Sequence, residues 1–384
     1  MLDETRYRDL GLEDIRASVL AGKRLTIEDG QRLFACPDIL AVGALAHELR
    51  RRMHGDAAYY VVNQHINYSN LCVNGCRFCA FGRKKGDPLA FELSLDGILN
   101  KVRARSEDPI TEVHMVGGCH PTLPFGFYEE VLRGIKELRP ELRIKAFTAV
   151  EIAHFAKLEG ISTRQVLERL KDAGLDMLPG GGAEVFSPRV RSLLCPEKLN
   201  GEGWLDIARQ AHELGIRTNA TMLYGHLETE LERLEHLDGL RRLQDETGGL
   251  VCFIPLPFQP ANTGIQDIRP TTGVEDLKTM AVSRLMLDNV PHIKAYWVML
   301  TVKLAQVALY FGADDFDGTV VEEKIGHMAG AESEQALTRG ELERIIREGG
   351  FVPVERDCFF NAVGRGEIGQ AAPLTTKDTK STKE

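Results

Sequence analysis

Three cysteines lie close together in the segment HINYSNLCVNGCRFCAFGR, which covers residues 65–83. Cys72, Cys76 and Cys79 follow the spacing C-x-x-x-C-x-x-C, and the next cysteine along the chain is Cys119. A structural zinc site or a cubane iron–sulfur cluster held by protein alone uses four ligands. The spacing is too tight for one helix face and suits a loop around a compact metal centre. Three thiolates would leave one iron of a [4Fe–4S] cluster open to a small molecule.

An open iron can be chelated by a molecule that carries an amine and a carboxylate, such as the amino-acid part of S-adenosylmethionine. An electron from the cluster could then cleave the sulfonium and release a 5′-deoxyadenosyl radical, while the protein positions and shields it. Two other interpretations of the cysteines stay open. They could form a zinc site with a remote fourth ligand, or they could be three unrelated thiols.

The bulk composition is that of an ordinary globular protein. Of the 384 residues 43% are hydrophobic and 27% are charged, and the net charge of −9 argues against nucleic-acid binding. No run approaches 18 consecutive apolar residues, and the charged N-terminus lacks the hydrophobic region of a signal peptide. We therefore expect a cytoplasmic protein with no membrane contact. The eight cysteines should then be thiols or metal ligands.

Short apolar runs alternate with helical stretches about eight times after Gly55, which predicts parallel strands joined by crossovers. The count favours an α/β fold of the (β/α)8 TIM-barrel type. An open doubly wound sheet is less favoured, since no G-x-G-x-x-G follows the first run. The expected strands lie near Val61 and at 111–118, 142–148, 175–182, 217–223, 250–258, 292–300 and 307–313.

Four regions of the chain are expected. Residues 1–55 form an N-terminal helical extension, broken near Pro37, and residues 56–320 form the barrel. Residues 321–367 form a helical or irregular segment packed on the barrel, and residues 368–384 form a disordered tail of low apolar content. Within the barrel, Ser162 and Gln165 predict a capping box.

Polar and glycine-rich segments follow several of the expected strands. The cysteines follow the first strand, GGCHP the second, TAVE the third, PGGGAE the fourth, YGH the fifth and PLPF the sixth. In a barrel, the loops after the strands form the active site. We therefore expect these segments to share one cavity.

The cysteine motif, with Phe78 before its last cysteine, resembles the ligand motif of the radical S-adenosylmethionine superfamily. The resemblance extends from about residue 55 to 365 and is strongest to the aminofutalosine synthase family. Two sister families, dehypoxanthine futalosine cyclase and the synthase of the deazaflavin FO, share several of its motifs. The segments that carry the resemblance are CRFCAFGR, GGCHP, KAFTAVEI, LPGGGAE, PEKL, TNATMLYGH, LQDETGG, FIPLPFQPANTG, GADDFDGTVVEE and VPVERD.

This resemblance implies a radical transferase of menaquinone biosynthesis by the futalosine pathway. The adenosyl radical would add to the enol-ether double bond of 3-[(1-carboxyvinyl)oxy]benzoate to give 6-amino-6-deoxyfutalosine, methionine and bicarbonate. S-adenosylmethionine would be a consumed co-substrate, a [4Fe–4S] cluster the cofactor, and flavodoxin or ferredoxin the reductant. A futalosine cyclase or FO-synthase-like enzyme is the alternative, and a non-catalytic iron–sulfur electron-transfer protein is the alternative from another class.

The resemblance also implies roles for individual residues. Cys72, Cys76 and Cys79 would hold the cluster. Phe78 would pack toward the adenine, and the backbone of the glycine pair would meet the methionine amino group, although a tight turn would also require glycine there. The residues expected to bind S-adenosylmethionine are Phe78, Gly117, Gly118, Thr148, Glu151 and Glu184.

The implied substrate carries two carboxylates, so the cavity should offer cations or amide donors. Arg83 is the first candidate, with a solvated surface charge as the competing interpretation. His226 and Asn219 from the fifth strand are further candidates for contact with the substrate, as are His65 and Tyr68 from the first.

Overall fold

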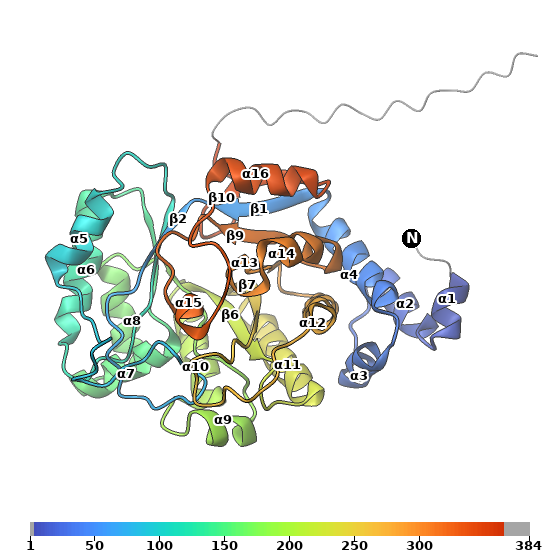
Figure 1. Cartoon of the computed structure of the whole chain (residues 1–384), viewed down its shortest axis with the longest axis horizontal. Helices are drawn as coiled ribbons and strands as arrows, with labels where there is room; N and C mark the ends of the chain where they lie inside the picture. The colour runs from blue at the N-terminus through green and yellow to red at the C-terminus, as the bar shows by residue number, and fades with distance from the viewer. Residues whose placement is uncertain (1–3, 365–384) are drawn as a thin grey trace, which may run out of the picture.

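Seven parallel strands form the curled sheet that positions the site (Figure 1). The computed structural model describes residues 4–364. In these residues the strands follow one another in chain order, and every neighbouring pair is parallel. The strands are β2 (Asn63–Ile66), β3 (Glu112–Met115), β4 (Arg143–Ala146), β5 (Met177–Leu178), β6 (Arg217–Tyr224), β7 (Leu250–Pro257) and β8 (His292–Ile293).

A short segment connects the two edges of this sheet. β9 (Asp315–Gly318) belongs to a second sheet of order β10-β1-β9, with β1 (Ala57–Val61) and β10 (Val352–Arg356). One isolated bridge joins Lys294 at the end of β8 to Asp315, and another joins Gln64 of β2 to Val321. Residues 315–321 therefore take the place of a regular eighth strand. The predicted TIM-type barrel is confirmed in this form.

Helices cover the outside of the sheet, as crossovers between parallel strands require. Figure 1 shows α5 to α8 along one flank and α10 and α11 along another. The capping box of Ser162 and Gln165 is confirmed at the start of α8. The helices are α5 (Leu95–Arg103), α6 (Phe125–Leu138), α7 (Ala149–Glu159), α8 (Thr163–Asp172), α9 (Pro188–Leu194), α10 (Gly201–Glu213), α11 (Glu230–Thr247) and α12 (Gly273–Met286).

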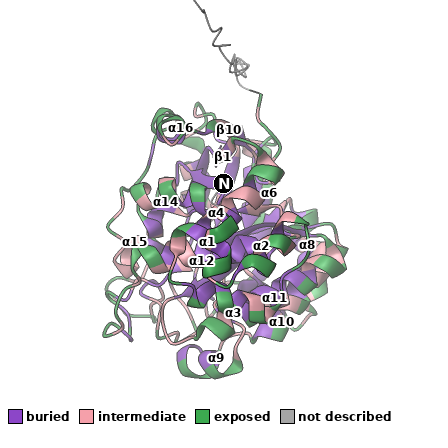
Figure 2. Ribbon diagram, turned by 90° about the vertical axis from the view of Figure 1, so that its right-hand side faces the viewer, coloured by how far each residue is buried: buried purple, intermediate pink, exposed green. Residues whose placement is uncertain are grey.

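The N-terminal helices pack against the barrel. Gly43 of α4 approaches Phe311 so closely that a Cβ at this glycine would lie 2.5 Å from the ring. The buried guanidinium of Arg50 donates to the carbonyls of Gly55, Ala57 and Ala313. Figure 2 looks onto these helices and shows exposed and intermediate residues on their outward faces. They are α1 (Glu4–Asp9), α2 (Glu13–Leu20), α3 (Ile27–Ala35) and α4 (Ile39–His54), so the break near Pro37 is confirmed.

The expected strand at 307–313 is wrong, because this stretch is helical. The buried residues Ala308 and Leu309 lie three and four positions after buried Ala305, which is helical spacing. The expected strand at 292–300 is also shorter than its range, since only His292–Ile293 is extended. The C-terminal helices are α13 (Trp297–Leu300), α14 (Val302–Ala308), the 3₁₀ helix η1 (Leu309–Phe311), α15 (Ile325–Ala329) and α16 (Arg339–Glu348).

The expected tail at 368–384 lies outside the described residues. Between residues 4 and 364, each helix is too short or too polar to cross a bilayer.

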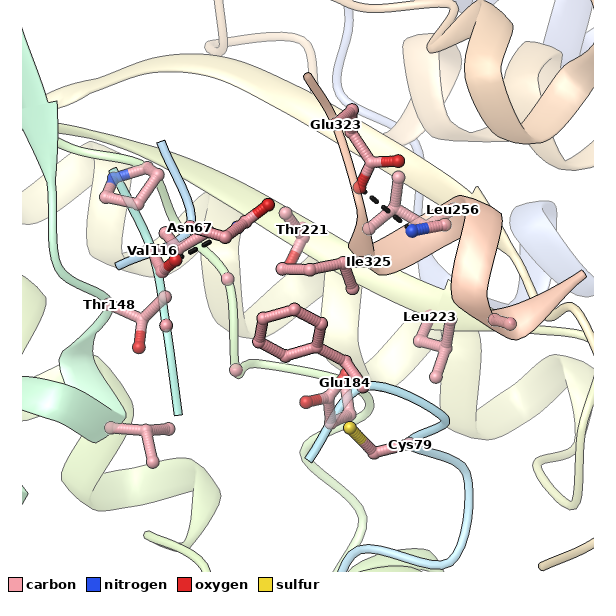
Figure 3. A pocket seen from close by; sticks show the side chains of 18 of the residues that line it. Asn67, Cys79, Val116, Thr148, Glu184, Thr221, Leu223, Leu256, Glu323 and Ile325 are labelled. Carbon is pink, nitrogen blue, oxygen red and sulfur yellow. Dashed lines mark hydrogen bonds between the residues drawn. The ribbon is translucent and has the colours of Figure 1, made fainter. Parts of the chain in front are cut away.

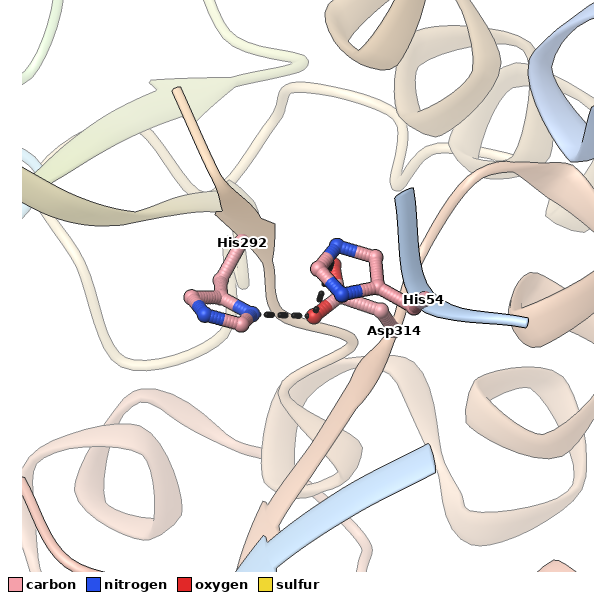
Figure 4. Close-up of side chains that lie close together, drawn as sticks. All are labelled: His54, His292 and Asp314. Atoms are coloured by element: carbon pink, nitrogen blue, oxygen red, sulfur yellow. Dashed lines mark hydrogen bonds and ion pairs between the residues drawn. The ribbon is translucent and has the colours of Figure 1, made fainter. Parts of the chain in front are cut away.

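A buried charge network ties β8 to the segment before β9 (Figure 4). Asp314 accepts from Arg284 at 2.5 Å and lies 2.6 Å from Nδ1 of His292 and 3.6 Å from Nε2 of His54. Burial alone would raise the pKa of Asp314, but the His292 hydrogen bond and the nearby cations lower it well below its usual value. Two histidines and one aspartate can bind a metal ion, yet the guanidinium of Arg284 would repel one here. We assign the group a structural role.

Two histidines on the outer layer should make the fold sensitive to acid. Burial and Arg209 lower the pKa of His212 to about 4, and burial lowers the pKa of His236 to about 3. In the unfolded chain both protonate near pH 6.5. Their contribution to stability is therefore complete above pH 6.5 and decreases as the pH falls toward 4 and 3. Between pH 7 and pH 5 we expect a loss of about 2 kcal/mol for each histidine, measured by urea unfolding.

The variant His236→Gln is the matched control for this effect. Glutamine keeps a donor for the Thr221 carbonyl, which lies 3.0 Å from Nε2 of His236, but it does not titrate. Between pH 7 and pH 5 the variant should lose about 2 kcal/mol less stability than the parent protein, which is the share expected for His236. An unchanged pH dependence in this variant would show that His236 titrates normally.

Candidate active site

A cavity of about 330 Å³ opens where the strands end. Its lining includes residues from the loops after β2, β3, β4, β5 and β7 and from α15. Figure 3 shows Cys79, Thr148, Glu184 and Leu223 around a common space, with Ile325 of α15 nearby. The expectation that strand-end segments share one cavity is confirmed for five of the six segments, and the YGH segment after β6 does not line it.

The three motif cysteines all line this cavity. Lys84 holds their loop in shape, because its ammonium donates to the carbonyls of Cys72, Val73 and Asn74 at 2.7–3.2 Å. At the other end of the motif, the amide of Gly82 donates to the sulfur of Cys79 at 3.3 Å.

The separation of the cysteine sulfurs distinguishes two kinds of metal centre. A single tetrahedral zinc ion would hold its sulfur ligands about 3.8 Å apart. In residues 4–364 the three cysteines do not form a set whose ligand atoms all lie within 4.8 Å of one another. The described residues therefore hold no preformed single-ion site at these cysteines, whereas three thiolates around one cavity suit an iron–sulfur cluster.

The glycine pair after β3 is required by close packing. A Cβ at Gly118 would lie 2.3 Å from the carbonyl oxygen of Leu71, and a Cβ at Gly117 would lie 2.5 Å from the ring of Tyr68. The amide of Gly118 donates to the Ser69 carbonyl at 2.8 Å. This pair therefore fastens the loop after β3 to the cysteine loop, and both glycines line the cavity.

Glu151 fixes the turn at Gly117 through hydrogen bonds. One carboxylate oxygen accepts from the hydroxyl of Tyr68 at 2.5 Å and from the amide of Gly117 at 3.1 Å, and the other accepts from Thr148. Burial raises the pKa of Glu151, and these hydrogen bonds oppose that shift. Thr148 and Glu151 form the capping box of α7 and also line the cavity. Tyr68 is buried behind Gly117 and does not line the cavity.

Glu184 and Lys198 form a buried ion pair beside the cysteines. Their charged atoms lie 2.5 Å apart, and the ammonium lies 5.3 Å from the centre of the Phe78 ring. Burial would raise the pKa of Glu184, but Lys198 lowers it, so the carboxylate is charged. All three side chains line the cavity. Lys198 was not among the sequence candidates, although it stands in the PEKL segment.

Two further candidates lie outside the cavity lining. Arg83 does not line the cavity, because its guanidinium donates to the carbonyls of Ala80 and Gly82 at 2.6 and 3.0 Å and thus braces the cysteine loop. His226 is also absent from the lining. Its Nδ1 lies 2.7 Å from Glu228, and its side chain is fully buried.

A row of polar side chains enters the barrel from three neighbouring strands. His65 of β2 is in register with His114 of β3, which is in register with Lys145 of β4. The two imidazoles stack with centres 4.5 Å apart, and all three residues line the cavity. Of these, only His65 was identified from the sequence. The signal in the sequence was weak, since these short strands read NQHI, EVHM and RIKA and each carries more than one polar residue.

Lys145 and Lys294 are the cavity cations that the sequence analysis missed. Nζ of Lys145 lies 2.5 Å from a Glu112 carboxylate oxygen, and Lys294 is bonded to Asp317. Both lysines are almost completely buried. They supply positive charge inside the barrel, where Arg83 was expected to do so.

Two amide oxygens of the lining have no hydrogen-bond partner among residues 4–364. They are Oδ1 of Asn67, whose amide nitrogen donates to the Val116 carbonyl (Figure 3), and Oδ1 of Asn219. Buried polar atoms are nearly always hydrogen-bonded. Unpaired acceptors in a cavity fit a ligand that brings its own donors, as the hydroxyls and ammonium of S-adenosylmethionine would.

Comparison with known families agrees with this geometry. Residues 66–240 match the model of the radical SAM superfamily, and residues 247–364 match the model described as the CofH/MqnC C-terminal region. The second match covers β7, β8 and the closing segment 315–321.

Three curated relatives match almost the whole chain. The aminodeoxyfutalosine synthase of Thermus thermophilus is 49% identical over 93% of this chain and 97% of its own length. That of Streptomyces coelicolor is 44% identical over 92% and 94%. The 5-amino-6-(D-ribitylamino)uracil–L-tyrosine 4-hydroxyphenyl transferase of Methanoculleus marisnigri is 43% identical over 91% and 97%.

A solved structure supports the fold. Methylornithine synthase superposes with a TM-score of 0.71 at 17% identity, covering 88% of this chain and 96% of its own. Matches of this extent in sequence and in fold agree with the cysteine loop at the barrel mouth. The chain belongs to the radical SAM superfamily and, within it, to the family of the aminodeoxyfutalosine synthases.

Proposed function

We propose that the protein is an aminodeoxyfutalosine synthase, the enzyme expected from the sequence resemblance. It would join the 5′-deoxyadenosyl group of S-adenosylmethionine to 3-[(1-carboxyvinyl)oxy]benzoate, giving 6-amino-6-deoxyfutalosine, methionine and bicarbonate. The observation that carries the proposal is the loop of three motif cysteines at the mouth of a barrel cavity. The identity of 49% to a synthase supports the choice of reaction.

The residues around the cysteines fit a cluster and its nucleoside. Cys72, Cys76 and Cys79 would hold a [4Fe–4S] cluster, which when bound supplies the electron that cleaves S-adenosylmethionine. Three thiolates make such a centre anionic, and Lys198 places a positive charge beside it. Phe78 offers a face for the adenine, and Thr148 and Glu184 offer oxygens to its polar groups. Glu151 would act by fixing the turn at Gly117, because its oxygens already accept four hydrogen bonds.

The residues farther into the barrel fit an aryl dicarboxylate. An ammonium has three donors, and Lys145 has one carboxylate neighbour, Glu112, so donors remain for a substrate carboxylate. Lys294, His65 and Asn219 complete the polar side of this region. The apolar side would pack on the aryl ring and exclude water. It is formed by Leu223, Ile254, Leu256 and Phe258.

Product analysis tests this function directly. The protein is reconstituted anaerobically with iron and sulfide, reduced, and incubated with S-adenosylmethionine and the aryl enol ether. We expect a product whose mass contains both the adenosyl and the aryl groups. Parallel incubations contain dehypoxanthine futalosine, or tyrosine with 5-amino-6-(D-ribitylamino)uracil. If a product forms only in one of these parallel incubations, the protein catalyses the corresponding sister reaction. If neither 5′-deoxyadenosine nor an adenosyl adduct forms in any incubation, a non-catalytic iron–sulfur protein is favoured.

Replacing the lysine and its partner together tests the substrate region. The double variant Lys145→Met with Glu112→Gln leaves no unpaired buried charge, and Glu112→Gln alone is the control. We expect kcat/KM for the enol ether to fall about 100-fold or more in the double variant, mainly through KM, because removing one partner of a buried charged contact costs about 2–5 kcal/mol. Glu112→Gln should stay within about tenfold of the parent protein. Equal kcat/KM values for the control and the double variant would show that Lys145 does not bind the substrate.

The remaining assignments are proposals of the same kind. A flavodoxin or ferredoxin would deliver the electron, and the protein would work in the cytoplasm. The N-terminal helices would act as an extension of the barrel, and residues beyond 320 as a C-terminal segment packed on it.

A further inference from the structure

We propose that Cys119 and Cys195 form disulfides with Cys72 and Cys76 when the cluster is absent. Neither Cys119 nor Cys195 belongs to the C-x-x-x-C-x-x-C motif, and both are buried. Each lies against a different motif cysteine. Two of the three cluster ligands would then be stored as protein disulfides in cluster-free protein.

The first pair joins the cysteine loop to the loop after β3. The thiols of Cys72 and Cys119 are within hydrogen-bonding distance of each other. The two backbones run side by side, since the amide of Val73 donates to the carbonyl of Cys119 at 2.9 Å. The side chain of Asn74 also donates to the sulfur of Cys119 at 3.5 Å, which fixes its position. Adjacent backbones and adjacent thiols are what a disulfide requires.

The second pair joins the cysteine loop to the end of α9. The thiols of Cys76 and Cys195 are likewise within hydrogen-bonding distance. The amide of Arg77 donates to the carbonyl of Leu194 at 2.8 Å, so the chain segments are again adjacent. The side chain of Cys76 packs against an apolar cluster that contains Cys195. The same arrangement therefore occurs twice, on two different elements.

Cys79 is the internal control for the pairing, because it is the motif cysteine for which no disulfide is proposed. No thiol contact is recorded for it within residues 4–364, and its sulfur accepts from the amide of Gly82. The other three cysteines lie in different parts of the fold: Cys36 follows α3, Cys252 lies within β7 and Cys358 follows β10. All three are buried.

The reaction is thiol–disulfide exchange with a low-molecular-weight disulfide as the oxidant. Cys72 and Cys76 are partly exposed, so each can attack the small disulfide and release one small thiol. The buried neighbour, Cys119 or Cys195, then attacks the motif sulfur of the mixed disulfide and releases the second small thiol. Each protein pair gives up two electrons and two protons, and each oxidant molecule becomes two thiols.

Such pairing would control cluster loading. A disulfide sulfur is not a thiolate and cannot bind iron, so oxidised protein would take up a cluster only after treatment with a thiol reductant. Disulfide pairing would also protect the thiols of Cys72 and Cys76 from irreversible oxidation. The inference needs the cysteine loop to be the cluster site but does not depend on the aryl substrate.

Peptide mapping tests the pairing in the full-length cluster-free protein. The protein is treated anaerobically with oxidised glutathione, alkylated, and digested with trypsin without reduction. Cleavage after arginine and lysine places Cys72 and Cys76 on residues 53–77, Cys79 on 78–83, Cys119 on 106–133 and Cys195 on 192–198. We expect one species that links 53–77 to both 106–133 and 192–198. Peptide 78–83 should be alkylated or carry glutathione, and it should not be linked to another peptide.

Two variants assign the individual bonds. Cys119→Ser should lose only the link to 106–133, and Cys195→Ser only the link to 192–198. Iron binding by the oxidised parent protein should fall at least tenfold and return after reduction with dithiothreitol. The inference is overturned if the three peptides run separately, if 78–83 is the linked peptide, or if oxidised protein binds iron as well as reduced protein. If protein treated with the oxidant contains no disulfide and still takes up the cluster, this inference is overturned, and the proposed function is unaffected.

Discussion

Replacing Cys79 by alanine is expected to abolish cleavage of S-adenosylmethionine, with a decrease of at least about a thousandfold, because the cluster that performs this chemistry would lose a ligand. Cys79 is the clearest position for this test. Cys119 and Cys195 lie beside the other two motif cysteines and could offer a replacement thiolate there. The measurements are bound iron after anaerobic reconstitution and formation of 5′-deoxyadenosine after reduction.

The fold should tolerate this change. Cys79 is partly exposed in a loop. Its sulfur accepts from the Gly82 amide, and its own amide donates to the Cys76 carbonyl, a bond that alanine keeps. The far-UV circular dichroism spectrum and the melting temperature of the cluster-free variant should match those of the parent. Cys36→Ala is the matched control, since it removes a thiol that follows α3 and should leave iron binding unchanged. Normal iron content with normal 5′-deoxyadenosine formation in Cys79→Ala would refute the assignment of the cluster ligands.

Replacing Asp314 by alanine is expected to destabilise the protein by about 3–5 kcal/mol, because it leaves the guanidinium of Arg284 buried without its carboxylate. Both side chains are completely buried, and their charged atoms lie 2.5 Å apart. The substitution also removes an acceptor for the amide of Ile293 in β8, at 2.7 Å. The free energy of unfolding in urea at pH 7 measures the effect.

Two further variants make the Asp314 result interpretable. Replacing the pair together, as Asp314→Leu with Arg284→Met, should recover part of the loss, since no buried charge then stays unpaired. Glu348→Gln removes an exposed ion pair with Arg344 on α16 and should change stability by less than about 1 kcal/mol. If Asp314→Ala were as stable as Glu348→Gln, the network would not support the barrel.

Strands with long apolar runs, such as LVCFIPLP of β7, were predictable because buried parallel strands are rich in apolar residues. The segment 315–321 that closes the barrel was not predictable, since the sequence GADDFDG carries three acidic residues and is typical of a loop. These acids are tolerated in the interior because cations from distant elements meet them, as Arg356 of β10 meets Asp315 and Lys294 meets Asp317. Such pairings join residues far apart in sequence, so no local pattern signals them.

The residues of the site also fall into a part that was predictable from the sequence and a part that was not. The cysteine loop was predictable, because its chemistry depends on spacing along a single loop. The cavity cations were not, because which side chain faces inward depends on strand register. Lys145 faces the cavity from the middle of a strand, while Arg83, which is adjacent to the motif, bonds to the backbone of its own loop.

The place of residues 315–321 between β2 and β8 has a consequence for shortened forms of the chain. A protein ending before Asp314 would leave two strand edges, at Gln64 and Lys294, with free amide and carbonyl groups. Exposed edges of this kind recruit strands from other molecules, so such a fragment should self-associate. Residues 315–321 are in this sense a condition for the barrel to remain closed.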